Sequence, residues 1–315
     1  MWLGSGGLLQ EYQSQTSKIE SLGERLESRD FYQGIIDNPL QNLVSTRIFM
    51  SFAHLAVLLL SFWLAWRLVG WLPALLAFLL IAFDPFHLAL SRVLHVDALL
   101  SNLYLLAILA ITAFLFQRRF YDLIIAATAA GLCWLTKSPG FFLIPTAALL
   151  FLLDFWFSSR QRPDDPLPGQ LWDYAWRFAL WVFLAASVFV LLWPAMWVNP
   201  LGALLEILAS AGGYAAEGHS SPIFFNGQVF PNGISGSRLA YFYPLTYLWR
   251  ATPITLLGLL AAAWAFFSKQ DLFSKPGVRR TLLSLLIAVF FFFLGMNLGS
   301  KKFDRYLLPV YPPLN

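Results

Sequence analysis

The chain has 315 residues, of which 58% are hydrophobic, 17% aromatic and only 12% charged. A soluble domain of this length cannot enclose so large an apolar fraction in one core, so the composition excludes an ordinary soluble protein and predicts an integral membrane protein. The formal net charge of +4 does not indicate a nucleic-acid partner, because membrane topology and lipid headgroups account for the cations.

Apolar runs long enough to cross a hydrocarbon layer of ~30 Å, about 20 residues as helix, recur along the chain. Five qualify outright, namely 48–66, 98–116, 178–205, 251–268 and 281–300. Three are weaker: 71–91, which Asp84-Pro85 interrupts, and the short runs 123–136 and 138–153, which Lys137 separates. The alternation typical of a membrane barrel is missing, so the runs predict an all-α bundle of about eight spans.

Around this bundle, at 48–315, the sequence predicts two external segments. Residues 1–47 are expected to form an external loop with amphipathic helices at the membrane interface, although 18–43 also fits a solvated loop helix. The second segment is the loop 199–243.

Three short basic links set the orientation. The links 117–120, 158–177 and 269–280 are rich in Arg and Lys and are therefore expected to be cytoplasmic. The opposite ends of the helices then face the external, periplasmic or lumenal side of a cell membrane that the chain crosses several times.

Ionisable residues gather on that external side, at the ends of apolar runs. They are Arg92, His95, Asp97, Lys137, Lys301, Lys302 and Arg305. Charges are costly at such places and usually line a site. Because an Arg fork suits phosphate oxygens and Lys supplies a point charge, the set predicts binding of a phosphate-bearing substrate.

Each of these residues also has a simpler interpretation. Arg92 can extend from a helix end into lipid headgroups or pair with Asp97, and Asp97 can favour the start of its helix. Lys137 can be a headgroup anchor. Lys301, Lys302 and Arg305, with Tyr306, would bind any anionic headgroup.

His95 is expected to support this network. His219 belongs to an aromatic-rich external loop that fits sugar stacking and an interfacial aromatic belt equally well. No His, Cys or carboxylate cluster has the spacing of a metal site, so no metal and no cofactor are predicted.

The order of these motifs resembles a known family. The matching segments are Asp84-Pro85, Ser91-Arg92, Asp97-Ala98-Leu99-Leu100, Gly131-Leu132, Leu135-Thr136-Lys137-Ser138-Pro139-Gly140, Trp193-Pro194-Ala195-Met196-Trp197, Pro222-Ile223-Phe224-Phe225-Asn226-Gly227, and Lys302-Phe303-Asp304-Arg305-Tyr306 with Pro309. Together they resemble the polyprenyl-phosphate-sugar-dependent membrane glycosyltransferases, which include protein O-mannosyltransferases and the aminoarabinose transferase of lipid A.

The resemblance implies a helical bundle of the C-type glycosyltransferase class. It also implies inverting transfer of a sugar from a polyprenyl-phosphate donor to an acceptor hydroxyl of a protein, lipid or cell-wall glycan. In that family the presumed catalytic base is an acid in the first external loop, which would lie upstream of Met1. The chain is therefore expected to be a fragment in which Asp97 supports catalysis, with little transfer activity by itself.

Two other classes of function stay open at this point. A transporter or flippase for a lipid or anion would also need charges in the membrane, but it predicts inverted repeats and charges near span centres. A noncatalytic fragment or pseudoenzyme would fit the missing first-loop acid. The acceptor and the sugar are not determined by the sequence.

Overall fold

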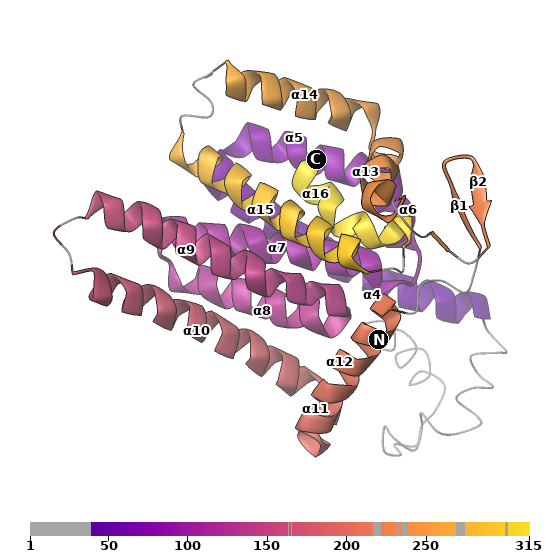
Figure 1. The fold of residues 1–315 in the computed structure, drawn as a ribbon, viewed down its shortest axis with the longest axis horizontal. Coiled ribbons are helices and arrows are strands. Elements are labelled where there is room, and N and C mark those ends of the chain that lie inside the picture. Colours follow the sequence, from indigo (N-terminus) through magenta and orange to yellow (C-terminus); the bar gives the residue numbers. More distant parts are fainter. Residues whose placement is uncertain are drawn as a thin grey trace.

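The computed structural model describes residues 39–162, 164, 166–216, 222–231, 233–234, 238–268, 275–299 and 302–315. Within these ranges the chain is almost entirely helical, as predicted for an all-α membrane protein (Figure 1). The expected external segment at 1–47 lies largely outside the described residues, since the first described helix begins at Pro39.

The first half of the bundle contains six α-helices and one short 3₁₀ helix. They are α4 (Pro39–Val69), α5 (Trp71–Phe83), α6 (Pro85–Arg92), α7 (Val96–Gln117), α8 (Phe120–Thr136), η1 (Ser138–Phe142) and α9 (Leu143–Gln161). The α5–α6 junction bends by 60°. Asp84 lies at this bend and accepts a hydrogen bond from the His87 N–H, while Pro85 occupies the first turn of α6. The bend falls where Asp84-Pro85 interrupts the apolar run 71–91, because proline starts a helix well but cannot continue one.

The second half continues the bundle and adds a small hairpin. Its elements are α10 (Leu167–Leu192), α11 (Ala195–Val198), α12 (Pro200–Ala216), β1 (Ile223–Phe225), β2 (Gln228–Phe230), α13 (Arg238–Arg250), α14 (Pro253–Phe267), α15 (Pro276–Leu298), η3 (Asp304–Val310) and α16 (Tyr311–Leu314). The predicted run 178–205 is divided, since α10 ends at Leu192 just before Trp193-Pro194. The strands β1 and β2 pair antiparallel through Asn226 and Gly227, both at positive φ.

Five stretches are long and apolar enough to cross a membrane: α4, α7, Ser138–Gln161, α10 and α15. Two bent pairs, α5 with α6 and α13 with α14, raise the number to seven. Helix α8 has 17 residues and is shorter than each of the five stretches that qualify alone. The multi-span bundle is therefore confirmed, whereas the count of eight stays a prediction.

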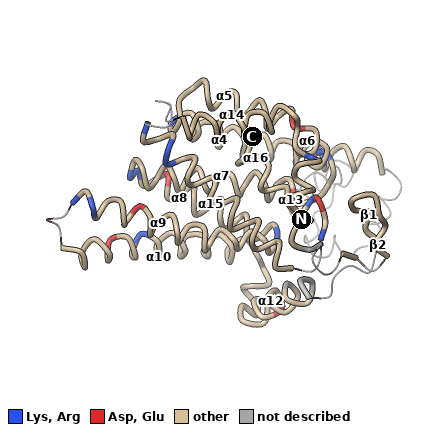
Figure 2. Tube along the Cα trace, turned by 45° about the horizontal axis from the view of Figure 1, so that its top comes forward, with Lys and Arg blue, Asp and Glu red and all other residues tan. Residues whose placement is uncertain are grey.

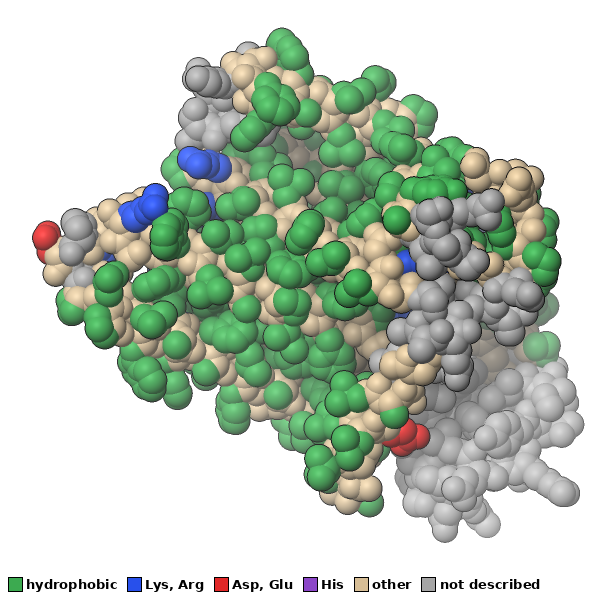
Figure 3. Space-filling view, in the orientation of Figure 1, with side chains coloured by type: hydrophobic (Ala, Val, Ile, Leu, Met, Phe, Trp, Pro, Cys, Tyr) green, Lys and Arg blue, Asp and Glu red, His purple; other side chains and the backbone are tan. Residues whose placement is uncertain are grey.

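Helix α7 forms the centre of the bundle. Its side chains from Asp97 to Leu115 are buried on every side, as expected for a helix that is apolar all round. It packs against α8, α4, α15 and α9. Tyr104, in the middle of α7, donates a hydrogen bond to the carbonyl oxygen of Ala288 on α15 at 3.2 Å. The outer helices instead expose large hydrophobic side chains, which cover the face seen in Figure 3.

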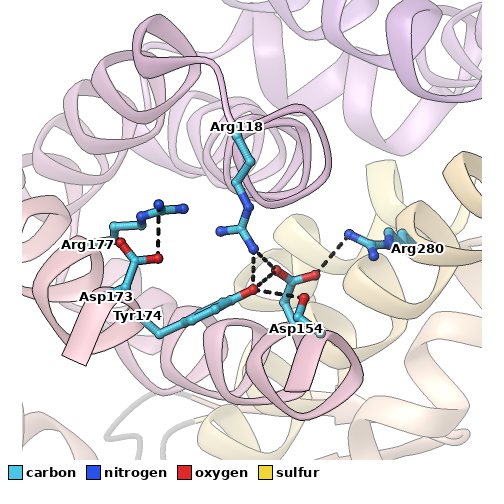
Figure 4. A network of polar contacts seen from close by, with 7 residues as sticks. Arg118, Asp154, Asp173, Tyr174, Arg177 and Arg280 are labelled. Carbon is cyan, nitrogen blue, oxygen red and sulfur yellow. Dashed lines mark hydrogen bonds and ion pairs between the residues drawn. The ribbon is translucent and has the colours of Figure 1, made fainter. Parts of the chain in front are cut away.

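Charged side chains gather toward the two ends of the bundle (Figure 2). At the end where α7 finishes, Asp154 of α9 accepts from Arg118 at 2.6 Å and from Arg280 of α15 at 2.9 Å, and Tyr174 of α10 joins the same carboxylate (Figure 4). Nearby, Arg67 of α4 forms a two-pronged ion pair with Asp122 of α8. These contacts bring the predicted basic links to one end of the bundle.

Candidate functional site

The opposite end of α7 carries the only acid predicted for the site, Asp97. His95 is the N-cap of α7, and its Nδ1 accepts a hydrogen bond from the Asp97 N–H at 3.3 Å. Asp97 then falls in the first helical turn, where the helix dipole stabilises an acid. Its residue surface is only 2% exposed, so its charge needs close partners.

Lys137 reaches this carboxylate from the end of α8. The residue is the C-cap of α8 in an extended conformation, and its Nζ lies 2.6 Å from Asp97 Oδ1. Gly140 makes the following turn possible, because a Cβ there would lie 2.6 Å from the carbonyl oxygen of Cys133. The turn therefore holds Lys137 next to the start of α7, and its ammonium also lies 4.2 Å from the Tyr306 ring centroid.

Arg305 approaches Asp97 from η3. Its Nε lies 3.6 Å from Asp97 Oδ2, which is near enough for an ion pair but too far for a hydrogen bond. The guanidinium group lies over the rings of Phe303 and Tyr306, at 4.9 and 5.7 Å. Helix η3 is held against α7 by Ser101, whose hydroxyl donates to the carbonyl oxygen of Leu308 at 3.1 Å.

We call His95, Asp97, Lys137, Arg305 and Tyr306 the Asp97 cluster. The side chains of His95, Lys137 and Arg305 are 33%, 25% and 38% exposed, so the cluster opens to the outside through its cationic and imidazole groups while the carboxylate stays buried. The cations are therefore held in place by one acid and still present N–H groups to a ligand.

His95 faces Asp97 through a single nitrogen. Its Nδ1 also lies 3.0 Å from Asp97 Oδ2, the oxygen that has no hydrogen-bond partner among the described residues. Burial lowers the pKa of His95 below its ordinary value; Asp97 acts in the opposite direction, and the Arg305 and Lys137 cations add to the lowering. We therefore expect His95 to be neutral near pH 7.

Two residues predicted to bind phosphate, Arg92 and Lys302, are not part of the Asp97 cluster. Arg92 is the exposed last residue of α6, and the described contacts include no ion pair between it and Asp97, which pairs with Lys137 and Arg305 instead. A phosphate role for Arg92 stays a prediction.

For Lys302 the structure corrects the prediction. Its side chain is fully buried, and its Nζ donates to the carbonyl oxygens of Met296 and Asn297 at 2.9 and 3.0 Å. These carbonyls lie in the last turn of α15, where a cation satisfies unpaired acceptors. Lys302 thus caps α15 and has no exposed surface to offer a phosphate. Lys301 and His219 lie outside the described residues.

The sequence interpretation overlooked a buried polar chain beside the cluster. His87 Nε2 lies 2.9 Å from Asn102 Oδ1, and Asn102 Nδ2 lies 2.9 Å from His54 Nδ1. The chain links α6, α7 and α4 at the same end as Asp97. Asn102 and His54 both fall inside long apolar runs, and this was the signal that could have identified them.

Chemically, the cluster suits an anion. Two cations from separate elements, with neighbouring imidazole and phenol groups, can bind phosphate oxygens and stabilise charge that develops on them. Among the described residues, no group of three His, Cys, Asp or Glu side chains is arranged to hold a metal ion.

A comparison with known protein families found a match. Residues 41–162 match the model of the dolichyl-phosphate-mannose-protein mannosyltransferase family. The matched range includes His95, Asp97 and Lys137 and supports the resemblance for the motifs from Asp84-Pro85 to Gly140. No curated protein and no solved structure matched the chain.

Proposed function

We propose that this chain, whose residues 41–162 match the dolichyl-phosphate-mannose-protein mannosyltransferase family, takes part in transfer of a sugar from a polyprenyl-phosphate donor to an acceptor hydroxyl. The supporting observation is that Lys137 and Arg305, from distant parts of the sequence, meet at the buried Asp97. A multi-pass membrane protein with a cationic cluster at one bundle end suits a donor whose lipid lies in the membrane and whose phosphate lies at its surface.

The donor is a phosphodiester, and breaking its bond to the sugar leaves additional negative charge on the phosphate. Lys137 would oppose that charge as a point cation, and Arg305 would do so through its planar fork. Pre-positioned cations of this kind stabilise a transition state because they need little reorganisation as the charge develops. Asp97 would set their positions.

Asp97 itself is poorly suited to be the general base. It is buried and bound to cations, whereas a base must reach the acceptor hydroxyl. We propose the external or lumenal side of the cell membrane for this site, because the basic links lie at the opposite end of α7. That separation is about 33 Å for a helix of 22 residues.

Donor binding by purified protein in detergent tests the proposal, with a short-chain polyprenyl-phosphate mannose as the probe. Lys137→Gln and Arg305→Gln should each weaken binding by about tenfold or more, since each removes a charge-assisted contact worth about 1.5–3 kcal/mol. Arg119→Gln is the matched control, because Arg119 is an exposed cation at the opposite end of α7. Equal losses in all three variants would contradict a phosphate site at Asp97.

Transfer is measured separately, with the sugar of the same probe radiolabelled. A rate of sugar transfer to an acceptor hydroxyl that is lower in the Lys137→Gln and Arg305→Gln variants than in wild-type protein would support an enzyme. Donor binding without transfer would fit the expected fragment, a lipid transporter and a noncatalytic partner alike.

A further inference from the structure

The Nδ1 atom of His95 cannot accept a hydrogen bond from one neighbour and donate one to the other at the same time. Nδ1 accepts from the Asp97 N–H at 3.3 Å, which requires a lone pair on that nitrogen. The same nitrogen lies 3.0 Å from Asp97 Oδ2, and a favourable contact with that oxygen requires a proton on Nδ1. The two arrangements are therefore alternatives, and the imidazole is already placed for either.

When the neutral imidazole of His95 carries its proton on Nε2, two polar atoms of the cluster lack hydrogen bonds. Asp97 Oδ2 and Arg305 Nε are both buried atoms with no hydrogen-bond partner among the described residues. They lie 3.6 Å apart, so the ion pair between them is loose. A proton on His95 Nδ1 would give Oδ2 a direct donor. The neutral Nδ1–H tautomer would supply this donor without proton uptake, whereas the imidazolium would also add a positive charge and free Arg305 to turn toward another anion.

The charges that face His95 come from three elements. They are Asp97 on α7, Lys137 at the end of α8 and Arg305 on η3, with the Tyr306 phenol behind Lys137. With His95 neutral, the cluster carries a single net positive charge, which matches the single negative charge of a phosphodiester donor. A phosphate monoester carries about 1.5 to 2 negative charges near pH 7, so the same cluster is short of positive charge for it.

We propose that His95 takes up a proton when the Asp97 cluster holds a polyprenyl monophosphate, the product that sugar transfer would leave behind. This inference rests on the proposed function. The proton moves the pairing of Asp97 from Arg305 to His95, and Arg305 becomes available to the second charge of the monoester. The N-cap hydrogen bond of α7 is lost in exchange, so the switch needs the additional anionic charge.

The chemistry of transfer balances with this step. The bond between the anomeric carbon and the phosphate oxygen breaks, and its electron pair stays on the phosphate. A bond forms between the acceptor oxygen and the same carbon, and the hydroxyl proton leaves to a base or to water. His95 takes its proton from solution, so departure of the product would be coupled to release of that proton.

Calorimetric titration in two buffers of different ionisation enthalpy measures the proton uptake. The probes are a short-chain polyprenyl monophosphate and the methyl phosphodiester of the same lipid, at about pH 7. The variant is His95→Asn, because Asn keeps a side-chain oxygen that can cap α7 but does not titrate. Any protonation of the monoester itself occurs with both proteins. Subtracting the proton uptake of the variant from that of the wild-type protein therefore removes this contribution.

Wild-type protein should take up a large part of one proton more than His95→Asn when it binds the monoester, and no more than the variant when it binds the diester. The variant should also lose affinity for the monoester at least about fivefold more than for the diester, as expected on losing one charge-assisted contact.

Equal proton uptake by both proteins, or equal losses for both probes, would show that His95 does not take up a proton with the monoester, and would overturn the inference while leaving the proposed function intact. Failure of the wild-type protein to bind either probe would overturn the proposed function, and this inference with it.

Discussion

Lys137 Nζ lies 2.6 Å from Asp97 Oδ1 across a sequence separation of 40 residues. This contact fastens the end of α8 to the first turn of α7, the central helix of the bundle. Asp97 is buried and Lys137 is partly exposed. The buried carboxylate therefore holds the Lys137 ammonium in place at the protein surface. The position of Lys137 thus depends on a carboxylate that a ligand does not need to touch.

We expect Asp97→Asn to destabilise the protein by about 1.5–3 kcal/mol, since it removes charge-assisted contacts from Lys137 and Arg305. Thermal unfolding in detergent measures the loss. Asp173→Asn is the matched control, because Asp173 is 48% exposed and pairs with Arg177 one helical turn away. Such surface pairs contribute about 0.5 kcal/mol or less. A control variant as unstable as Asp97→Asn would contradict a structural role for the cluster.

Lys302 should make stability depend on pH in the alkaline range. Burial lowers the pKa of Lys302 from 10.5 to about 8, so the folded protein releases the Lys302 proton at lower pH than the unfolded chain does. Below pH 8 the folded state carries the full cost of a buried ammonium. Between pH 8 and 10.5 the unfolded chain binds more protons, so the free energy of unfolding rises with pH.

Lys302→Met removes this titration, and the comparison isolates it from the titration of other groups. On raising the pH from 7.5 to 10, wild-type protein should gain stability relative to Lys302→Met, by an amount on the order of 2 kcal/mol. A constant difference between the two proteins across this range would refute the assignment of a buried, titrating Lys302.

Gly131 should be intolerant of even the smallest side chain. A Cβ at this position would lie 2.5 Å from the carbonyl oxygen of Ala185 on α10 and 2.8 Å from the Cβ of Val188. Since a backbone oxygen cannot swing aside, Gly131→Ala should force α8 and α10 apart and lower the unfolding free energy by about 1–3 kcal/mol. Gly258→Ala on α14 meets nothing within 4 Å and should be neutral or slightly stabilising. Equal thermal stability of the two variants would disprove the close contact.

Topology can be tested with reporters at the two ends of the bundle. A reporter between α9 and α10 should read cytoplasmic, and one in the turn at Asn226 and Gly227 should read external or lumenal. The physical reason is the excess of Arg and Lys in the short links. Both reporters on the same side would remove the basis for placing the Asp97 cluster on the external face.

The sequence by itself determined that the chain is a helical membrane protein. Apolar runs of this length match the thickness of a bilayer, and a helix satisfies all of its backbone hydrogen bonds within lipid. It also identified Asp97, Lys137 and Arg305 as candidates, since charges beside such runs are costly and therefore informative. Asp84-Pro85 was correctly interpreted as a break between two helices, because the constraint that proline imposes is local.

Only the tertiary structure decided which of these charges meet. The sequence allowed Arg92 to pair with Asp97 five residues away, whereas packing of α8 and η3 against α7 brings Lys137 and Arg305 there instead. It likewise directs Lys302 inward to cap α15, although Arg305 is only three residues further along the chain. Sequence spacing fixes contacts within a helix, but contacts between helices depend on how their surfaces pack, and that arrangement is set by the whole bundle.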